Sequence, residues 1–159
     1  MTTLSNLPTY RTPIHDEWID FNAHLRDAYY GLIFSYATDD LMDQLGMDAA
    51  YRARTQNTLY SLELHIHYLR EVKRSDELTV TAGIIAADRK RIHAAFSMTC
   101  PRLGEPAATA EFMLLHVHQG AEPKGVPFPD DIRAKVETLR SLTGAHPSLG
   151  AASRKIELR

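Results

Sequence analysis

One long helical pattern followed by several strand patterns is the feature that most constrains this chain of 159 residues. Between Ala28 and Leu45, apolar residues recur at intervals of three and four, the spacing that places them on one face of an α-helix. Gly46 follows directly and is a typical helix stop, because glycine adopts the left-handed conformation that ends many helices. The pattern therefore predicts one long helix with a single buried face.

The hydrophobic period then changes to that of a strand. Alternation from Leu59 to Leu69 predicts a strand with two different sides. One side carries Tyr60, Leu62, Leu64, Ile66 and Tyr68, and the other carries Leu59, Ser61, Glu63, His65, His67 and Leu69. Three further strand-like runs follow at Glu77–Ala87, Arg91–Cys100 and Thr109–His118. Short connections with turn residues separate these runs, so we expect an antiparallel meander.

The remaining segments complete an α+β fold. Thr9–Ile14 resembles a short strand, Asp48–Arg54 a helical turn capped by Asp48, and Asp130–Leu142 a helix after a loop at 121–129. We therefore predict an antiparallel sheet of about five strands wrapped around one long central helix. Residues 1–142 would form this single domain, and residues 143–159 a loosely held tail. The exposed edge of such a sheet invites pairing with a second copy, as a homodimer or a dimer of dimers.

Composition excludes several classes of partner. Eighteen basic and twenty acidic residues give a net charge of -2, without the basic excess of a nucleic-acid-binding protein. The apolar stretches are too short to cross a membrane, and the polar N-terminus lacks a secretory h-region. A lone cysteine, Cys100, excludes an internal disulfide framework. We expect a cytoplasmic protein that binds neither nucleic acid nor membrane.

The segment Asp20–Tyr30 is the strongest clue to function. Asp20, Asn22 and His24 stand together just before the predicted helix. The free N–H groups of a first helical turn can polarise a carbonyl, and a neighbouring carboxylate can act as a base. This combination suits acyl transfer to water. The competing interpretation is an ordinary helix cap, since Asp and Asn are preferred at that position.

Several sequence blocks resemble the hotdog-fold thioesterases of the 4-hydroxybenzoyl-CoA thioesterase-like group, and within it the betainyl-CoA thioesterases of bacterial carnitine degradation. The blocks are residues 17–22, 58–63, 88–93, 111–117 and 127–129, in an order and spacing that extend over about residues 9–132. Arg26 stands where many relatives carry Asn. The resemblance implies an acyl-CoA thioesterase without a cofactor, with Asp20 at the position of the group's catalytic acid.

Thioester hydrolysis needs few catalytic groups, because a thiol with a pKa near ~8.5 leaves as the thiolate with little assistance. Backbone N–H groups at about residues 24–29 would polarise the carbonyl. Asp20 would act as general base for water or attack directly to form an anhydride, and the sequence leaves both routes open. Asn22 and His24 would orient water or hold Asp20. Glu63 is a second candidate acid, with a solvated strand face as the alternative.

Aromatic residues near Asp20 are the only basis in the residues for choosing an acyl group. Aromatic rings attract quaternary ammonium groups by cation–π interaction. The candidate substrate-binding residues are Trp18, Tyr29, Tyr30 and Tyr60, together with Glu63, and Glu17 would add negative charge. Core packing is the alternative for the tyrosines. A converging set would favour a trimethylammonium acyl group such as that of betainyl-CoA, with another short or aromatic acyl-CoA, or a non-catalytic binding module, as alternatives.

The remaining candidates are a basic cluster, two histidine pairs with metal-ligand spacing and a single cysteine. Arg89, Lys90 and Arg91 are the densest cationic run and would bind the phosphates of CoA, with a solvated turn as the alternative. His65-x-His67 and His116-x-His118 each place two imidazoles on one strand face, but neither pair has the further ligands of a zinc site, so we expect no metal. Cys100 has no partner residue that would make it a nucleophile.

Overall fold

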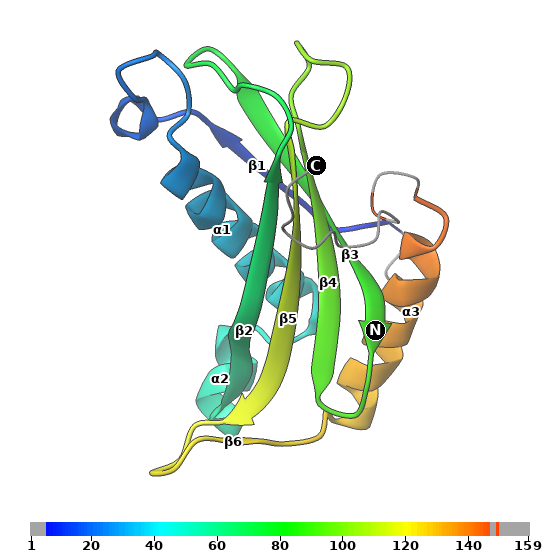
Figure 1. Cartoon of the computed structure of the whole chain (residues 1–159). Coiled ribbons are helices and arrows are strands. Elements are labelled where there is room, and N and C mark those ends of the chain that lie inside the picture. Colours follow the sequence, from blue (N-terminus) through cyan, green and yellow to red (C-terminus); the bar gives the residue numbers. More distant parts are fainter. Residues whose placement is uncertain (1–5, 147–148, 150–159) are drawn as a thin grey trace, which may run out of the picture.

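The computed structural model describes residues 6–146 and 149, which form a strongly curled sheet around one long helix (Figure 1). The elements, in chain order, are β1 (Thr9–Pro13), a 3-10 turn (Asp16–Trp18), α1 (Asp27–Leu45), α2 (Ala49–Thr55), β2 (Asn57–Tyr68), β3 (Glu77–Ala87), β4 (Arg91–Thr99), β5 (Ala108–His118), β6 (Lys124–Gly125) and α3 (Asp130–Thr143). The predicted α+β class, with a sheet wrapped around one helix, is confirmed. Residues 1–5 of the predicted domain, and 147–148 and 150–159 of the predicted tail, lie outside the described residues.

The predicted elements fall within a few residues of the observed ones. Gly46 ends α1 with φ 90°, and the Asp48 side chain caps α2 by accepting the N–H of Tyr51 at 2.8 Å. The two-residue strand β6 was expected to be loop, because a segment this short leaves no periodic pattern. No helix in the described part of the chain is long and apolar enough to span a membrane.

The strand order differs from the predicted meander. The sheet runs β1-β3-β4-β5-β2 and all of its pairings are antiparallel, so β2 lies beside β5 rather than beside β3, its neighbour in sequence. β1 occupies the free side of β3, and β2 therefore pairs with the open edge of β5, from Asn57↔His118 to Tyr68↔Ala108. Alternation identifies a strand but not its partner, which is why the sequence misplaced β2.

A β-bulge in β2 corrects the predicted sides of that strand. The register shifts between Ser61 and Glu63, so the two halves of β2 alternate with opposite parity. Leu59 lies opposite the buried His116, on the side that faces α1, and Tyr60 therefore projects from the convex side of the sheet. The prediction that Tyr60 shares a side with Tyr68 is wrong, because the bulge inserts one extra residue between them.

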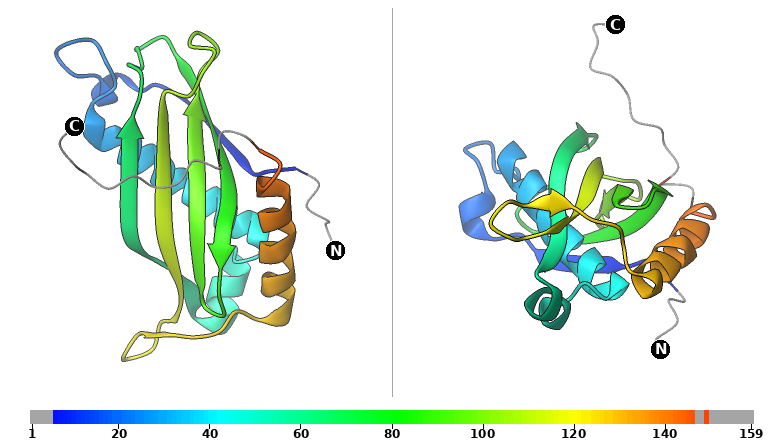
Figure 2. Two further views of the ribbon diagram at one scale, coloured as in Figure 1. Left: turned by 45° about the vertical axis from the view of Figure 1, so that its right-hand side comes forward. Right: turned by 90° about the horizontal axis from the view of Figure 1, so that it is seen from below.

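The core lies between α1 and the concave side of the sheet. Phe34 of α1 packs edge-on against Phe96 of β4 at 6.1 Å between ring centroids, and Phe96 contacts Phe112 of β5 at 5.3 Å. All three rings are buried. Figure 2 shows that the sheet curls around α1, while α3 lies along β3. Burial of apolar surface, to which these rings contribute, is the main favourable contribution to folding.

An ion pair between a buried carboxylate and an exposed guanidinium holds the connection between β2 and β3. Asp76 lies in the turn before β3 and is almost fully buried, and its carboxylate accepts two hydrogen bonds from Arg102, at 2.9 and 2.7 Å. Asp76 also accepts the N–H of Lys73 at 2.8 Å, and Arg102 donates to the carbonyl of Glu71 at 2.9 Å. These contacts hold residues 71–76 in one conformation. The hydrogen bond from Arg102 is the main reason why the pKa of Asp76 lies below its ordinary value.

A second buried polar contact joins β5 to α2. One ring nitrogen of His116, Nδ1, lies 2.9 Å from the carbonyl of Val126, and Nε2 lies 2.9 Å from the hydroxyl of Tyr51. Because only a protonated Nδ1 can donate to the carbonyl, Nε2 of the neutral ring accepts from Tyr51. The imidazole also stacks on Phe128 at 4.9 Å. Burial lowers the pKa of His116, although hydrogen bonds to the backbone of Val126 and Pro127 oppose this.

We expect Arg102→Met to destabilise the fold by about 1.5–3 kcal/mol, because it leaves the buried Asp76 carboxylate without its charged donor. Urea unfolding at pH 7.5 would measure the effect. Arg74→Met is the matched control, since Arg74 pairs with the exposed Asp16 and an exposed pair contributes about 0–1 kcal/mol. Equal losses in the two variants would contradict a structural role for Asp76–Arg102.

We also expect His116 to make the free energy of unfolding fall as the pH is lowered. Its folded-state pKa lies below its unfolded value near 6.5, so its contribution is fully present above about pH 6.5. The contribution is lost as the pH falls toward the folded pKa, because the unfolded chain then binds the proton more readily. Urea unfolding between pH 7.5 and 5 should show a shallower pH dependence for His116→Gln, with the exposed His15→Gln as the control. An unchanged slope would exclude His116 as a source of the dependence.

Candidate active site

Asp20 lies in a tight loop, residues 19–25, that leads into α1 and is called the Asp20 loop below. Its N–H donates to the carbonyl of His24 at 2.9 Å, and the N–H of Ala23 returns to the carbonyl of Asp20 at 3.0 Å. Ala23 sits in the left-handed region with φ 63°, which lets the chain reverse within four residues. A bridge from Ile19 to Leu25 joins the two ends of the loop, and a bridge from His24 to Lys73 joins the loop to the β2–β3 connection. The carboxylate of Asp20 is therefore carried on a well-defined turn.

One oxygen of Asp20 holds the loop together. Its Oδ1 accepts the N–H of Asn22 at 2.8 Å and the N–H of His24 at 3.2 Å. The N-cap position of α1 belongs to Arg26, which makes no side-chain cap, so Asp20 is not the cap of that helix. The other oxygen, Oδ2, has no hydrogen-bond partner among the described residues. Asp20 thus combines one anchored oxygen with a second that is available for chemistry.

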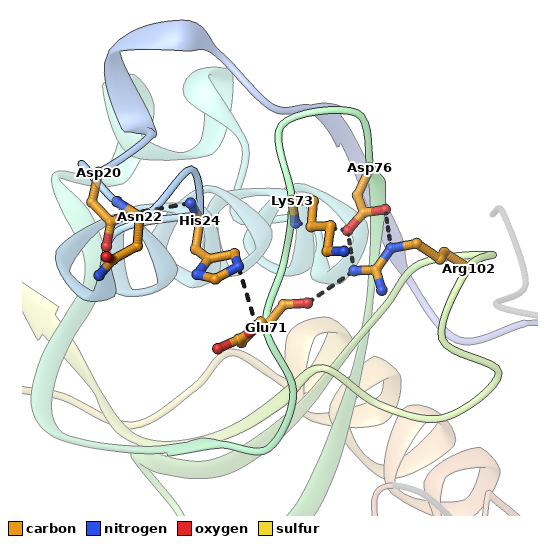
Figure 3. Close-up of polar contacts among 7 residues, drawn as sticks. All are labelled: Asp20, Asn22, His24, Glu71, Lys73, Asp76 and Arg102. Carbon is orange, nitrogen blue, oxygen red and sulfur yellow. Dashed lines mark hydrogen bonds and ion pairs between the residues drawn. The ribbon is translucent and has the colours of Figure 1, made fainter.

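The two polar residues expected to assist Asp20 contact it through their backbones. Both Asn22 and His24 donate their N–H groups to the carboxylate. The ring of His24 instead points toward Glu71, with Nε2 and Oε2 3.2 Å apart (Figure 3). Glu71 lies in the connection that Asp76 and Arg102 stabilise, so this contact links the Asp20 loop to that connection.

An open cleft of about 680 Å³ lies in front of Asp20. Its walls come from the Asp20 loop, the start of α1, the end of β2 and the β2–β3 and β4–β5 connections. The residues lining it are Asp20, Leu25, Asp27, Tyr30, Tyr68, Leu69, Arg70, Glu71, Lys73, Arg102 and Leu103. The cleft therefore combines carboxylates, cations and two tyrosines, with Asp20 in its wall. Asp27, Tyr68 and the residues from 69 onward were not predicted, because only the folded chain brings them to Asp20.

Most of the backbone donors expected over residues 24–29 are already used. Leu25 donates its N–H to the carbonyl of Val72 at 2.8 Å, and Arg26 donates to the carbonyl of Trp18 at 2.9 Å. The N–H of Ala28 is taken by the side chain of Asp27. The N–H of Asp27 itself is left without an acceptor in the part of the chain that the structure describes. It opens the first turn of α1 and belongs to a residue of the cleft wall.

The predicted aromatic residues separate into two groups. Tyr30 lines the cleft, and its ring meets that of Tyr68 edge-on at 5.1 Å between centroids. Burial raises the pKa of Tyr30, and a hydrogen bond with the backbone of Val72 partly offsets that rise. Trp18 and Tyr29 stack on each other at 5.7 Å outside the cleft.

Tyr60 and Glu63 project from the convex side of the sheet, away from α1. Glu63 lines a hollow of about 220 Å³ together with His65, His93 and Glu111. His93 and Glu111 pair there, with 3.1 Å between Nε2 and Oε1. In one copy of the chain, neither Tyr60 nor Glu63 therefore lies in the Asp20 cleft.

The basic run at Arg89–Arg91 lies on the β3–β4 hairpin, at the opposite end of the sheet from the Asp20 loop (Figure 1). Asp88 organises this turn by accepting the N–H groups of Lys90 and Arg91 at 2.9 and 2.7 Å. These hydrogen bonds, with those from the side chain of Arg91, lower the pKa of Asp88 to about 2.

The described residues contain no group of three or more His, Cys, Asp or Glu residues placed to hold a metal ion. The imidazole of His116 is engaged by Tyr51 and Val126. Cys100 is buried, and that burial raises the pKa of its thiol, which makes it a poor nucleophile.

Known proteins resemble this chain over nearly its whole length. A family model described as the thioesterase-like superfamily matches residues 14–136. The betainyl-CoA thioesterase of Pseudomonas aeruginosa is 41% identical over 152 residues, which are 96% of this chain and 95% of that protein. An L-carnitine dehydrogenase/betainyl-CoA thioesterase of Rhizobium meliloti is 34% identical over 88% of this chain, which corresponds to 27% of that protein.

Two solved structures have closely similar folds. A Staphylococcus aureus protein in complex with CoA superimposes with a TM-score of 0.84 and 26% identity, over 100% of this chain and 99% of that one. A putative thioesterase from Pseudomonas putida has a TM-score of 0.83 and 38% identity, over 98% of this chain and 99% of that one.

Proposed function

The chain belongs to the thioesterase-like superfamily, and on that premise we propose that it hydrolyses betainyl-CoA to glycine betaine and CoA. The observation that carries the proposal is the carboxylate of Asp20, with one oxygen anchored in its loop and the other available at the cleft. The identity to a betainyl-CoA thioesterase over nearly the full length of both chains supports this choice of acyl group.

The geometry supports two separate roles, with the start of α1 polarising the carbonyl and Asp20 acting as base or nucleophile. The unused N–H of Asp27 would donate to the thioester oxygen, where the positive end of the helix dipole also stabilises the developing negative charge. The free oxygen of Asp20 would then remove a proton from water, or attack the carbonyl carbon itself. The thiolate of CoA leaves in either case, and no group is needed to protonate it in the transition state.

We assign Asn22 and His24 to positioning. Their backbone N–H groups hold one oxygen of Asp20 in place, which keeps the carboxylate in a fixed orientation. The side chain of His24 is committed to Glu71, so its contribution to catalysis passes through the loop rather than through contact with water beside Asp20.

The open edge of β2 supports a homodimer. β2 has β5 on one side and no strand on the other among the described residues, and its middle exposes Leu62 and Leu64, with relative accessibilities of 55% and 42%. An unpaired strand edge with exposed apolar side chains favours pairing with another strand. Two β2 strands that are related by a two-fold axis pair in antiparallel orientation. The end of one copy that carries the Asp20 loop would then lie beside the end of the other copy that carries the β3–β4 hairpin.

This pairing would also account for the basic hairpin. Within one copy, Arg89, Lys90 and Arg91 lie far from Asp20, but the hairpin of a partner copy would lie at the same end as this copy's cleft. We propose that this hairpin binds the phosphates of CoA across the dimer. A cytoplasmic location, where CoA thioesters are available and thiols stay reduced, fits both the substrate and the single buried cysteine.

Asp20→Asn should lower kcat/KM for betainyl-CoA by about 10²–10⁴-fold, the range typical for loss of a general base. The amide oxygen of Asn still accepts the two loop N–H groups, so the fold should be retained. Thiol release with a panel of acyl-CoA substrates would measure the activity, and Asp43→Asn on the exposed side of α1 is the control. Near-normal turnover by Asp20→Asn would exclude this mechanism, and CoA binding without thiol release by the unmodified protein would indicate a non-catalytic module.

Leu62→Lys should convert the protein from a dimer to a monomer, because it places a charge at the proposed contact between two β2 edges. Light scattering during size-exclusion chromatography would report the mass of each species. Ala134→Lys, on the exposed side of α3, is the matched control and should leave the mass unchanged. A monomeric unmodified protein would overturn the proposed dimer, as would a dimer that Leu62→Lys does not affect.

A further inference from the structure

The length of the acyl group restricts where its cation can bind, if the proposed function is correct. In betainyl-CoA, one methylene separates the quaternary nitrogen from the thioester carbonyl. If the carbonyl oxygen accepts the N–H of Asp27, the trimethylammonium group must lie within a few ångströms of that residue. The subsite for the cation therefore has to be formed by residues next to Asp27.

Two tyrosines lie beside Asp27. The hydroxyl of Tyr68, at the end of β2, donates to the carbonyl of Asp27 at 3.4 Å. The ring of Tyr68 packs edge-on against that of Tyr30, and both rings line the cleft. Tyr30 is held rigidly in the core, whereas Tyr68 keeps 55% of its surface exposed. A rigid ring and an exposed ring meeting at a right angle form a corner of aromatic surface on the cleft side of α1.

The charges around this corner favour a cation. The carboxylate of Asp27 is exposed at the cleft, and its negative charge adds to the effect of burial in raising the pKa of Tyr68. Two cations that line the cleft are neutralised, Arg70 by Glu105 at 2.7 Å and Arg102 by Asp76 at 2.7 Å. Lys73 also lines the cleft, and Figure 3 shows its side chain extending toward Arg102 and Asp76.

We propose that Tyr30, Tyr68 and Asp27 form the subsite for the trimethylammonium group of the acyl chain. The two rings attract the cation through their faces, which carry partial negative charge, and the Asp27 carboxylate supplies a full opposite charge. Tyr68 is then the specificity-determining residue, because its exposed ring is the part of the corner that a ligand reaches first. Trp18, Tyr29 and Tyr60, which are equally aromatic, lie outside the cleft and take no part.

The test compares two acyl groups of the same shape. Betainyl-CoA and 3,3-dimethylbutanoyl-CoA differ in that a quaternary nitrogen replaces a quaternary carbon. We expect the unmodified protein to favour betainyl-CoA. Tyr68→Leu should reduce the ratio of the two kcat/KM values by about 2- to 30-fold, which corresponds to the usual range of one cation–π interaction. Asp27→Asn should reduce the same ratio, because it removes charge and keeps the size of the side chain.

Two further variants separate recognition of the cation from structure. Tyr68→Phe keeps the ring but loses the hydroxyl, so it should retain most of the preference that Tyr68→Leu loses. Tyr36→Leu removes a tyrosine that is 41% exposed on α1, outside the cleft, and should leave the ratio unchanged. Because Tyr68 lies on the strand proposed to form the dimer, the mass of every variant should be measured alongside its activity.

Tetramethylammonium gives a readout that does not depend on turnover. It should inhibit hydrolysis of betainyl-CoA competitively, and Tyr68→Leu should weaken that inhibition by a similar factor. An unchanged substrate ratio in both Tyr68→Leu and Asp27→Asn would overturn the subsite alone. Equal kcat/KM of the unmodified protein for the two substrates would overturn the subsite and betainyl-CoA as the substrate together, and failure to hydrolyse any acyl-CoA would overturn the proposed function itself.

Discussion

The concave side of the sheet has to be covered, and α1 is the element that covers it. Phe34 of α1 meets Phe96 and Phe112 at the centre of this contact, where all three rings are buried. The helix cannot slide or rotate without exposing apolar surface on both partners, so its ends are fixed relative to the sheet. Its first turn consequently lies beside the end of β2 and the connection that follows, and the cleft forms where these three segments meet.

The Asp20 loop shows how one side chain serves structure and chemistry together. A carboxylate has two oxygens, and here Oδ1 accepts two backbone N–H groups that hold the turn. The same hydrogen bonds direct Oδ2, so the group that is proposed to act on water is oriented before substrate arrives. The contact of His24 with Glu71 extends this support to the β2–β3 connection, which Asp76 and Arg102 stabilise in turn.

The two sides of the sheet differ in polarity. The concave side is apolar and carries the helix, whereas the convex side carries His65, His93, Glu63 and Glu111. In the proposed dimer, the two-fold symmetry would bring the Asp20 cleft of one copy beside the basic hairpin of the other. The open edge of β2 is where the described part of the chain permits that pairing.

The sequence by itself determined the elements and the first candidate residue. The period of α1, the stop at Gly46 and the cap at Asp48 are local signals, since helices form between residues that are close in the chain. Local signals also identified Asp20 as a candidate catalytic residue. It stands just before α1, and it lies in one of the sequence blocks that resemble thioesterases. Its precise contacts were not predicted, as it caps its own loop rather than the helix.

Only the tertiary structure decided which residues gather around Asp20. The pairing of β2 with β5 brings Tyr68 to Asp27, residues 41 apart in sequence, and one bulge moves Tyr60 to the other side of the sheet. Glu71, Lys73 and Arg102 enter the cleft through turns that have no periodic pattern. How distant surfaces cover one another decides the strand partners, the bulges and the long-range contacts. Hydrophobic alternation along the chain does not predict any of these three features.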